Sequence, residues 1–337
     1  MQKRAFVLIF ICLLLAGCGK RPDETPHRRT VFAMDTVMNL TVYGENGDKA
    51  LDAAEQDLRR LDALLARGAE TSAVHTLNQY GFAEDEETAA LLEKAGEISA
   101  ATGGAFDATL GKVLDLWGFG SGAGDYRVPP DAELDAALAA VGMERVFVDG
   151  EEIRLAAFTE VDLGGIVKGY ACERMFDRMK ENGVVTAVFD LGGDVALWGG
   201  KSDGPWRVAI KDPEDEGAFL GILETDGGRF IMTSGVYERY FEENGARYHH
   251  ILDPKTGRPA DSDLVSATVV CQNGIWADAL ATACCVVGAD GALALRERLA
   301  DTMPFDLILI TDDARALYTC EGFAPETNNG YAYEKVA

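Results

Sequence analysis

Apolar residues recur every three or four positions in several stretches of the chain, and this spacing predicts amphipathic helices. The clearest stretch is residues 48–67, where the apolar stripe consists of Leu51, Ala54, Leu58, Leu61 and Leu65. We expect this stripe to lie in the core. The same spacing, together with helix-starting and helix-ending residues, predicts further helices at 88–101, from 131 onward, from the turn at 162 to about 180, and at 276–287 and 289–299.

Short runs rich in β-branched and aromatic residues lie between these stretches and predict strands. The predicted strands are 37–43, 186–189, 195–198, 206–210, 221–224, 230–233, 250–252, 266–270 and 306–310, with a hairpin over 145–155. Residues 105–126 are rich in glycine with isolated aromatic side chains, which favours a binding loop or lid. Two Asp-Leu-Gly-Gly turns, at Asp162 and Asp190, suggest a duplicated element. Together these elements predict a globular α+β fold.

The N-terminal residues are typical of an export signal followed by a tether. Lys3 and Arg4 precede an apolar run over residues 5–17, which is shorter than the roughly 17–25 residues of a membrane-spanning helix. The run ends in Leu15-Ala16-Gly17-Cys18, which resembles a bacterial lipobox with Cys18 as the lipidated residue. The predicted division of the chain is a signal peptide at 1–17, a lipidated tether at 18–29 and one domain at 30–337. We therefore expect an exported protein that is held at a cell membrane by its lipid and works close to that surface.

Charge and cysteine content narrow the possible partners. The chain carries 31 Lys and Arg against 56 Asp and Glu, a net charge of −25. A surface this acidic repels a phosphate backbone, so we expect no nucleic acid partner. Seven cysteines occur, two of them in the N-terminal segment, and the other five form no C-x-x-C pair. The sequence therefore predicts neither a zinc site nor a disulfide scaffold.

The segment Asp162-Leu-Gly-Gly-Ile-Val-Lys168-Gly169 is a candidate phosphate site. Its glycines let a backbone approach a ligand closely, while a helix N-terminus and Lys168 supply donors and positive charge. It matches neither the phosphate-loop pattern nor the G-x-G-x-x-G dinucleotide pattern. A tight turn into a helix, without any ligand, explains the segment equally well.

Asp278 and Thr282 stand four residues apart in a predicted helix, so both side-chain oxygens can face one point. A carboxylate, a hydroxyl and a backbone carbonyl are ligands that suit Mg²⁺, which keeps other positions for water and phosphate. The alternative is structural: Asp278 is a cap-like charge on the helix surface near the helix start, and Thr282 bonds to its own backbone.

His249 and His250 stand at the start of a predicted strand that runs into the turn Asp253-Pro-Lys-Thr-Gly257. We expect one histidine to point to each side. If His250 faces a cleft, its near-neutral pKa suits flavin binding or taking a proton from a hydroxyl. A purely structural histidine remains the alternative.

Taken in order, these motifs resemble the ApbE family, the FAD:protein FMN transferases, over nearly the whole chain after the tether. The matching motifs are Met34-Asp35-Thr36, Gly104-Ala-Phe106-Asp107, Asp162-Leu-Gly-Gly-Ile-Val-Lys168-Gly, Asp190-Leu-Gly-Gly-Asp194, Thr233-Ser-Gly-Val-Tyr237-Glu-Arg-Tyr, His250-Ile-Leu-Asp-Pro-x-Thr-Gly and Asp278-Ala-Leu-Ala-Thr282. Two positions depart from the family pattern: Asp35 stands where many members have glycine, and Val236 where an acidic residue is common.

The resemblance implies an ApbE-like fold related to the T-fold, with mixed sheets, flanking helices and an FAD cleft between two halves. It also implies a set of site residues. Those expected to bind FAD are Met34, Ala105, Phe106, Asp107, Asp162, Lys168 and His250, and those expected to bind Mg²⁺ are Asp278, Thr282 and the carbonyl of Gly165.

The implied reaction is Mg²⁺-dependent transfer of the FMN half of FAD to a threonine hydroxyl, with release of AMP. Lys168 would stabilise charge and His250 would act as the base. The implied acceptors are exported flavoprotein domains, such as subunits of sodium-pumping or Rnf-type redox complexes. Two alternatives stay open: a Mg²⁺-dependent FAD pyrophosphatase that releases FMN and AMP, and a flavin-binding lipoprotein without catalysis.

Overall fold

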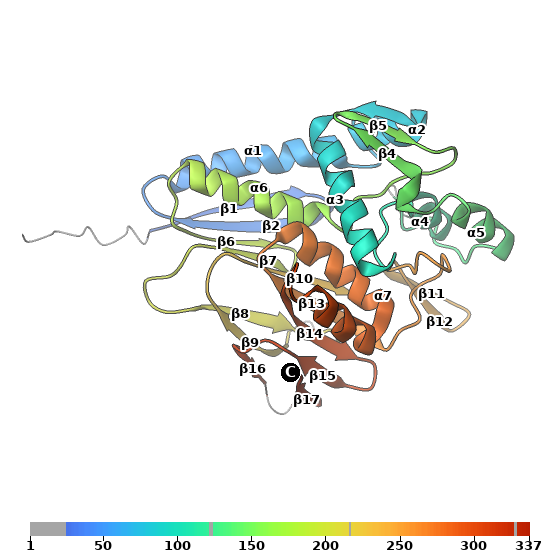
Figure 1. The fold of residues 1–337 in the computed structure, drawn as a ribbon. Helices are drawn as coiled ribbons and strands as arrows, with labels where there is room; N and C mark the ends of the chain where they lie inside the picture. The colour runs from blue at the N-terminus through green and yellow to red at the C-terminus, as the bar shows by residue number, and fades with distance from the viewer. Residues whose placement is uncertain (1–24, 121–123, 216, 327–328) are drawn as a thin grey trace, which may run out of the picture.

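A large mixed sheet forms the centre of the molecule (Figure 1). The computed structural model describes residues 25–120, 124–215, 217–326 and 329–337. Nine strands of these residues make up the sheet, antiparallel except for the last pair. In spatial order they are β1 (Pro26–Ala33), β2 (Thr36–Tyr43), β6 (Thr186–Leu191), β7 (Asp194–Trp198), β10 (Arg229–Gly235), β13 (Leu264–Cys271), β14 (Phe305–Thr311), β15 (Arg315–Tyr318) and β17 (Ala332–Lys335).

The two faces of this sheet are covered by different layers, as Figure 1 shows. Helices α1 (Gly47–Leu65), α6 (Val167–Glu181) and α7 (Gly274–Leu299) pack on one face, and the predicted apolar stripe of α1 is buried there. A small sheet of β8 (Trp206–Lys211), β9 (Phe219–Thr225) and β16 (Phe323–Pro325) covers the other face. Successive side chains of a strand point to opposite faces of the sheet, so each strand contributes to both layers of the core. In β10, Phe230 and Met232 contact the helix-side core, whereas Ile231 contacts the core under the small sheet.

The remaining elements lie around the ends of α6 and α7. They are α2 (Ala73–Tyr80), β3 (Phe82–Glu84), α3 (Glu86–Thr102), α4 (Gly111–Trp117), α5 (Asp131–Leu138), a 3₁₀ turn (Met143–Arg145), β4 (Val146–Asp149), β5 (Glu152–Leu155) and the hairpin β11 (Tyr240–Glu243) with β12 (Ala246–His249). Aromatic rings join the hairpin to the segment after α4. Phe241 stacks on Tyr126 with ring centroids 5.4 Å apart, and Phe119 lies 5.9 Å from the same ring.

The two helices predicted at 276–287 and 289–299 form one continuous element with a break between them. Gly288 has φ +76° and ψ 178°, and Asp263 accepts a hydrogen bond from the N–H of Ala289 at 2.9 Å, as it would at the start of a new helix. The described residues contain one helix long and apolar enough to cross a membrane, and it is α7. Because α7 packs against β10 and β13, it is a core helix.

Several sequence predictions need correction. The strand predicted at 250–252 is absent, because β12 ends at His249 and Leu252 makes only an isolated bridge to Pro259, which has no N–H to donate. The loop predicted at 105–126 contains α4, and its residues 121–123 lie outside the described residues. Strand β1 begins at Pro26, so the last four residues assigned to the tether belong to the sheet.

The N-terminal predictions fall mostly on residues that the structure does not describe. The signal peptide, Cys18 and the first part of the tether lie before residue 25.

The two Asp-Leu-Gly-Gly turns are not a duplicated element. The turn at Asp162 precedes a helix, whereas the turn at Asp190 joins the antiparallel strands β6 and β7.

Candidate active site

The N-termini of α6 and α7 cross with almost no space between their backbones. A Cβ atom built on Gly169 would lie 2.0 Å from the carbonyl oxygen of Gly274, and one built on Gly274 would lie 2.5 Å from the carbonyl oxygen of Gly169. No side chain fits at either position, so both glycines are needed for the close approach. This crossing brings the turn after Asp162 against the first turns of α7.

Each of the two helices caps the other. Asp278 on α7 accepts a hydrogen bond from the N–H of Gly169 at 2.9 Å. In return, Glu173 on α6 accepts from the N–H groups of Gly274 at 2.7 Å and Ile275 at 3.2 Å. Both carboxylates therefore meet unpaired N–H groups at a positive helix end.

The prediction that Asp278 lies on the helix surface is wrong. Only 4 % of the residue is exposed, and burial raises the pKa of its carboxyl to about 6, against the lowering effect of the Lys168 charge. Asp278 is also not the cap of its own helix, because Asn273 holds that position by accepting from the N–H of Trp276 at 2.9 Å. A buried carboxylate that is costly to ionise is a feature typical of functional sites.

Thr282 lies one turn after Asp278 and faces the glycine turn. Its hydroxyl is 3.2 Å from the hydroxyl of Ser234, at the end of β10. A Cβ atom on Gly165 would lie 3.5 Å from Thr282 Oγ1 and 3.2 Å from the ring of Phe106. The three residues expected to bind metal thus lie together, although Gly165 is more than a hundred positions from the other two in the chain.

The chemistry of these donors fits Mg²⁺. They offer a buried carboxylate, a hydroxyl and a backbone carbonyl, which are hard oxygen ligands. Within the residues that the structure describes, no three histidine, cysteine or carboxylate side chains cluster as a complete protein cage would require. Such a partial set leaves coordination positions for water and for the phosphates of a substrate, which is how Mg²⁺ usually binds.

Lys168, on the first turn of α6, forms an ion pair with Asp194 at the start of β7. Burial disfavours the ammonium form, but the negative charges of Asp194 and Asp278 outweigh it and raise the pKa of Lys168. Lys168 is therefore a permanent cation. Asp194 is held in turn by the N–H of Thr233, which donates to its other oxygen at 2.8 Å.

The predicted flavin segment at 105–107 lies beside the Asp162 turn. The N–H of Asp162 donates to the carbonyl of Ala108 at 2.7 Å, and its carboxylate accepts from the N–H of Gly164 at 2.8 Å. Ala105 and Phe106 are buried. Burial raises the pKa of Asp107, whose carboxylate accepts hydrogen bonds from Thr109. Asp162 and the 105–107 segment thus form one wall next to Gly165.

Met34 lies farther along the same end of the sheet, in the turn between β1 and β2. It has φ +51°, and its N–H donates to Asp62 at 3.0 Å. A Cβ atom on Gly192 would lie 2.1 Å from the hydroxyl of Thr36, so the two strand turns touch. Met34 is connected to the rest of the site through the turn that leads to Asp194.

His250 follows the last residue of β12 and is half-buried. Its Nδ1 lies 3.2 Å from the carbonyl of Arg239, which can only accept, so Nδ1 carries the proton and Nε2 is left as an acceptor. Burial, together with the nearby charges of Arg239 and Lys168, lowers the pKa of His250 from 6.5 to about 3. The near-neutral pKa expected from the sequence is therefore wrong, because burial disfavours the charged ring. The imidazole is neutral and within electrostatic range of Lys168.

Sequence reasoning missed two residues that fix the Asp162 turn. Asn78 on α2 makes a double hydrogen bond to Val161, donating to its carbonyl and accepting from its N–H at 2.8 Å each. Arg67 pairs with Glu160 at 2.6 Å and with Asp115 at 2.5 Å. The sequence holds no signal for these contacts, since the partners are 48 to 93 positions apart.

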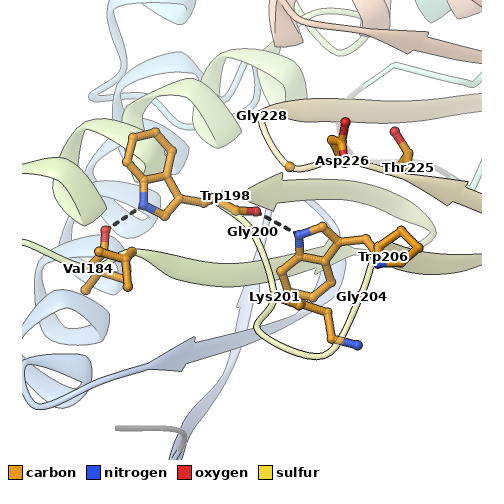
Figure 2. A pocket seen from close by; sticks show the side chains of 13 residues that line it. Val184, Trp198, Gly200, Lys201, Gly204, Trp206, Thr225, Asp226 and Gly228 are labelled. Carbon is orange, nitrogen blue, oxygen red and sulfur yellow. Dashed lines mark hydrogen bonds between the residues drawn. The ribbon is translucent and has the colours of Figure 1, made fainter. Parts of the chain in front are cut away.

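A hollow of about 820 Å³ lies at the opposite end of the strands, and Figure 2 shows it lined by Trp198 and Trp206. Its wall includes Val184 before β6 and Gly200 after β7, whereas Asp194 starts β7 at the other end. Trp198 and Trp206 donate their indole N–H groups to the carbonyls of Val184 and Gly199. This hollow is therefore separate from the residues around Asp278.

Comparison with known proteins relates this geometry to a family. The ApbE family matches residues 34–305. The chain is 34 % identical to the FAD:protein FMN transferase of Vibrio cholerae, over 93 % of this chain and 96 % of that protein. It is 32 % identical to the Salmonella typhimurium protein of the same name, over 87 % of this chain and 90 % of that protein. The chain belongs to the ApbE family.

Solved ApbE structures have the same fold. The ApbE protein of Thermotoga maritima superposes with a TM-score of 0.79 at 32 % identity, covering 90 % of this chain and 96 % of that one. The flavinyl transferase ApbE of Pseudomonas stutzeri gives 0.77 at 30 % identity, covering 91 % and 95 %. The predicted ApbE-like α+β fold is thereby confirmed, and the chain is an enzyme of the transferase class.

Proposed function

We propose that this ApbE enzyme transfers the FMN half of FAD to a threonine hydroxyl of an acceptor flavoprotein in a Mg²⁺-dependent reaction that releases AMP. The names of its relatives support flavin transfer. The threonine acceptor and the AMP product are what the family resemblance implies, and the oxygen donors of the site support the magnesium requirement.

One observation carries the proposal: the buried carboxylate of Asp278 meets the N-terminus of α6 beside the glycine turn. A diphosphate bound at that turn would reach both the helix N-terminus and Lys168. It would also lie next to the oxygens of Asp278 and Thr282. Had the two motifs folded to opposite sides of the molecule, no shared site for a metal and a dinucleotide could exist.

Mg²⁺ bound to Asp278, Thr282 and the carbonyl of Gly165 would supply charge neutralisation for the diphosphate. The residues of this chain have their own tasks. Lys168, a permanent cation, would stabilise the negative charge that develops as the diphosphate separates. Asp162 and the 105–107 segment would hold the flavin half.

The covalent step exchanges one phosphorus–oxygen bond for another. The acceptor hydroxyl oxygen bonds to the phosphorus of the FMN half, and the bond from that phosphorus to the bridging oxygen breaks, so that AMP leaves with this oxygen. Nε2 of His250 is the acceptor for the hydroxyl proton, because Nδ1 is already engaged with Arg239.

We further propose that the enzyme works outside the cytoplasm, anchored by a lipid on Cys18, on exported acceptor domains such as those of sodium-pumping or Rnf-type complexes. Strand β1 starts at the end of the sheet opposite to Asp194, since Pro26 pairs with Tyr43 and Tyr43 with Thr186. The site would therefore lie far from the anchor, where a separate acceptor domain can approach it.

The test uses the full chain with FAD, Mg²⁺ and a candidate acceptor domain. A mass increase equal to FMN on the acceptor, AMP as the second product, and loss of both with chelator are expected. Rapid release of free FMN and AMP without acceptor would identify a pyrophosphatase instead. Tight FAD binding without any product would indicate a carrier. Replacing the acceptor threonine with valine should abolish the mass increase and thereby identify the attacking hydroxyl.

A further inference from the structure

Lys168 lies within reach of two buried carboxylates but pairs with only one of them. Its ammonium forms the ion pair with Asp194, whereas the carboxylate of Asp278 is turned to the backbone N–H of Gly169. Asp278 is nevertheless close to Lys168, because it binds the N–H of the next residue, Gly169, at 2.9 Å. The charges of both carboxylates raise the pKa of Lys168. Glu238 also acts on Lys168, but less strongly than Asp194 or Asp278.

Asp194 is fixed more rigidly than its partner. Only 2 % of its surface is exposed, against 24 % for the Lys168 side chain. One of its oxygens accepts from the N–H of Thr233 in the adjacent strand, and the hydroxyl of Thr233 pairs with that of Thr268 at 2.9 Å. The carboxylate is therefore set by three neighbouring strands, and the flexible lysine must come to it.

We infer that Asp194 is a positioning residue that holds the Lys168 ammonium away from Asp278, so that the Asp278 carboxylate stays available to a divalent cation. The inference rests on the proposed function and adds a residue to it. A buried ammonium needs a partner. Without Asp194, the nearest buried carboxylate is Asp278, and an ammonium paired there would compete with the cation.

The net charge of Asp194, Asp278 and Lys168 supports the same inference. Asp194, Asp278 and Lys168 together carry a net charge of −1, which attracts a divalent cation. Replacing Asp194 by asparagine brings the sum to zero and frees the ammonium. Loss of a group that orients a metal ligand typically weakens metal binding by about 10–100-fold.

The experiment measures Mn²⁺, as a paramagnetic probe of the magnesium site, binding to the full chain without flavin. Free Mn²⁺ is followed by electron paramagnetic resonance. Asp194→Asn should raise the dissociation constant by about 10–100-fold. The matched control is Asp57→Asn, which removes a different buried carboxylate, on α1, that pairs with Arg178 near the C-terminal end of α6. It should leave Mn²⁺ binding unchanged.

A second replacement distinguishes loss of the positioning role from a general disturbance of the structure by Asp194→Asn. If the released ammonium is the competitor, adding Lys168→Met to Asp194→Asn should recover most of the lost Mn²⁺ affinity, and Lys168→Met alone should bind at least as tightly as the unaltered protein. Failure of the second replacement to restore binding would overturn the inference, as would wild-type affinity in Asp194→Asn. If Asp194→Asn does not fold, weaker binding by Lys168→Met alone overturns it equally.

The Mn²⁺ measurements distinguish failure of the proposed function from failure of the role inferred for Asp194. An unaltered protein that binds no Mn²⁺ at all would remove the metal site and with it the proposed function. Normal binding in the unaltered protein together with no effect of Asp194→Asn would remove only the role of Asp194.

Discussion

Replacing Asp278 by asparagine should stabilise the metal-free protein while abolishing its response to Mg²⁺. The two side chains have the same shape, and the amide oxygen of asparagine can still accept from the N–H of Gly169. The variant therefore removes the charge but keeps the cap on α6. Alanine would be a poorer choice, because it would leave that N–H without a partner in a buried position.

The magnitude follows from the carboxyl pKa. Burial raises the pKa of Asp278 from 3.8 to about 6, so ionisation opposes folding at neutral pH. At 1.36 kcal/mol per pKa unit, the ionised group costs about 3 kcal/mol at pH 7, a figure that already contains the attraction to Lys168. The native state binds the proton more tightly than the unfolded chain. The penalty therefore shrinks as the pH falls below about 6 and disappears below about 4.

Urea unfolding with chelator present measures this difference. At pH 7, Asp278→Asn should be more stable by about 3 kcal/mol, and the gap should narrow at pH 5. Adding Mg²⁺ should stabilise the unaltered protein and not the variant. The reasoning would be refuted by a variant that is less stable than the unaltered protein at pH 7, or by one that transfers FMN at the normal rate.

Three further predictions concern the helix crossing, the base and the first turn. Gly169→Ala should unfold at a clearly lower temperature and respond weakly to Mg²⁺, because its Cβ would lie 2.0 Å from the carbonyl of Gly274; a normal melting temperature would contradict this. His250→Ala should slow FMN transfer at saturating FAD by about 10²–10⁴-fold, and an unchanged rate would exclude it as the base. Asp35 has φ +58°, so Asp35→Val should lower the unfolding free energy by about 1–2 kcal/mol while Asp35→Gly stays within about 0.5; equal effects would exclude backbone strain.

Local pattern predicted most of the helices and strands correctly, and it failed where polar side chains mask a strand. Strand β1 contains His27 and two arginines, yet it pairs with β2 along its whole length. β1 lies at the sheet edge, where Arg28 is exposed, whereas His27 and Arg29 lie against α1 and pair with its carboxylates. The sequence alone does not reveal this position. The short α4 was missed for a different reason. Its seven residues are too few to show a helical spacing of apolar positions.

The candidate site was predicted residue by residue, but not its internal contacts. The spacing of Asp278 and Thr282 indicates that their oxygens share a helix face. No local pattern indicates that this face meets the N-terminus of α6, or that Lys168 pairs with Asp194 and not with Asp278. Those contacts join residues 26 and 109 positions apart.

The sequence by itself determined the α+β class, the family and the residue types able to hold a cation and a diphosphate, because these depend on periodicity and on motifs within a few residues of one another. Only the tertiary structure decided that Asp278 is buried, that His250 is neutral and that Asp194 takes the ammonium of Lys168. These properties depend on desolvation and on charges brought together by the close packing of α6 against α7, and such effects act through space and not along the chain.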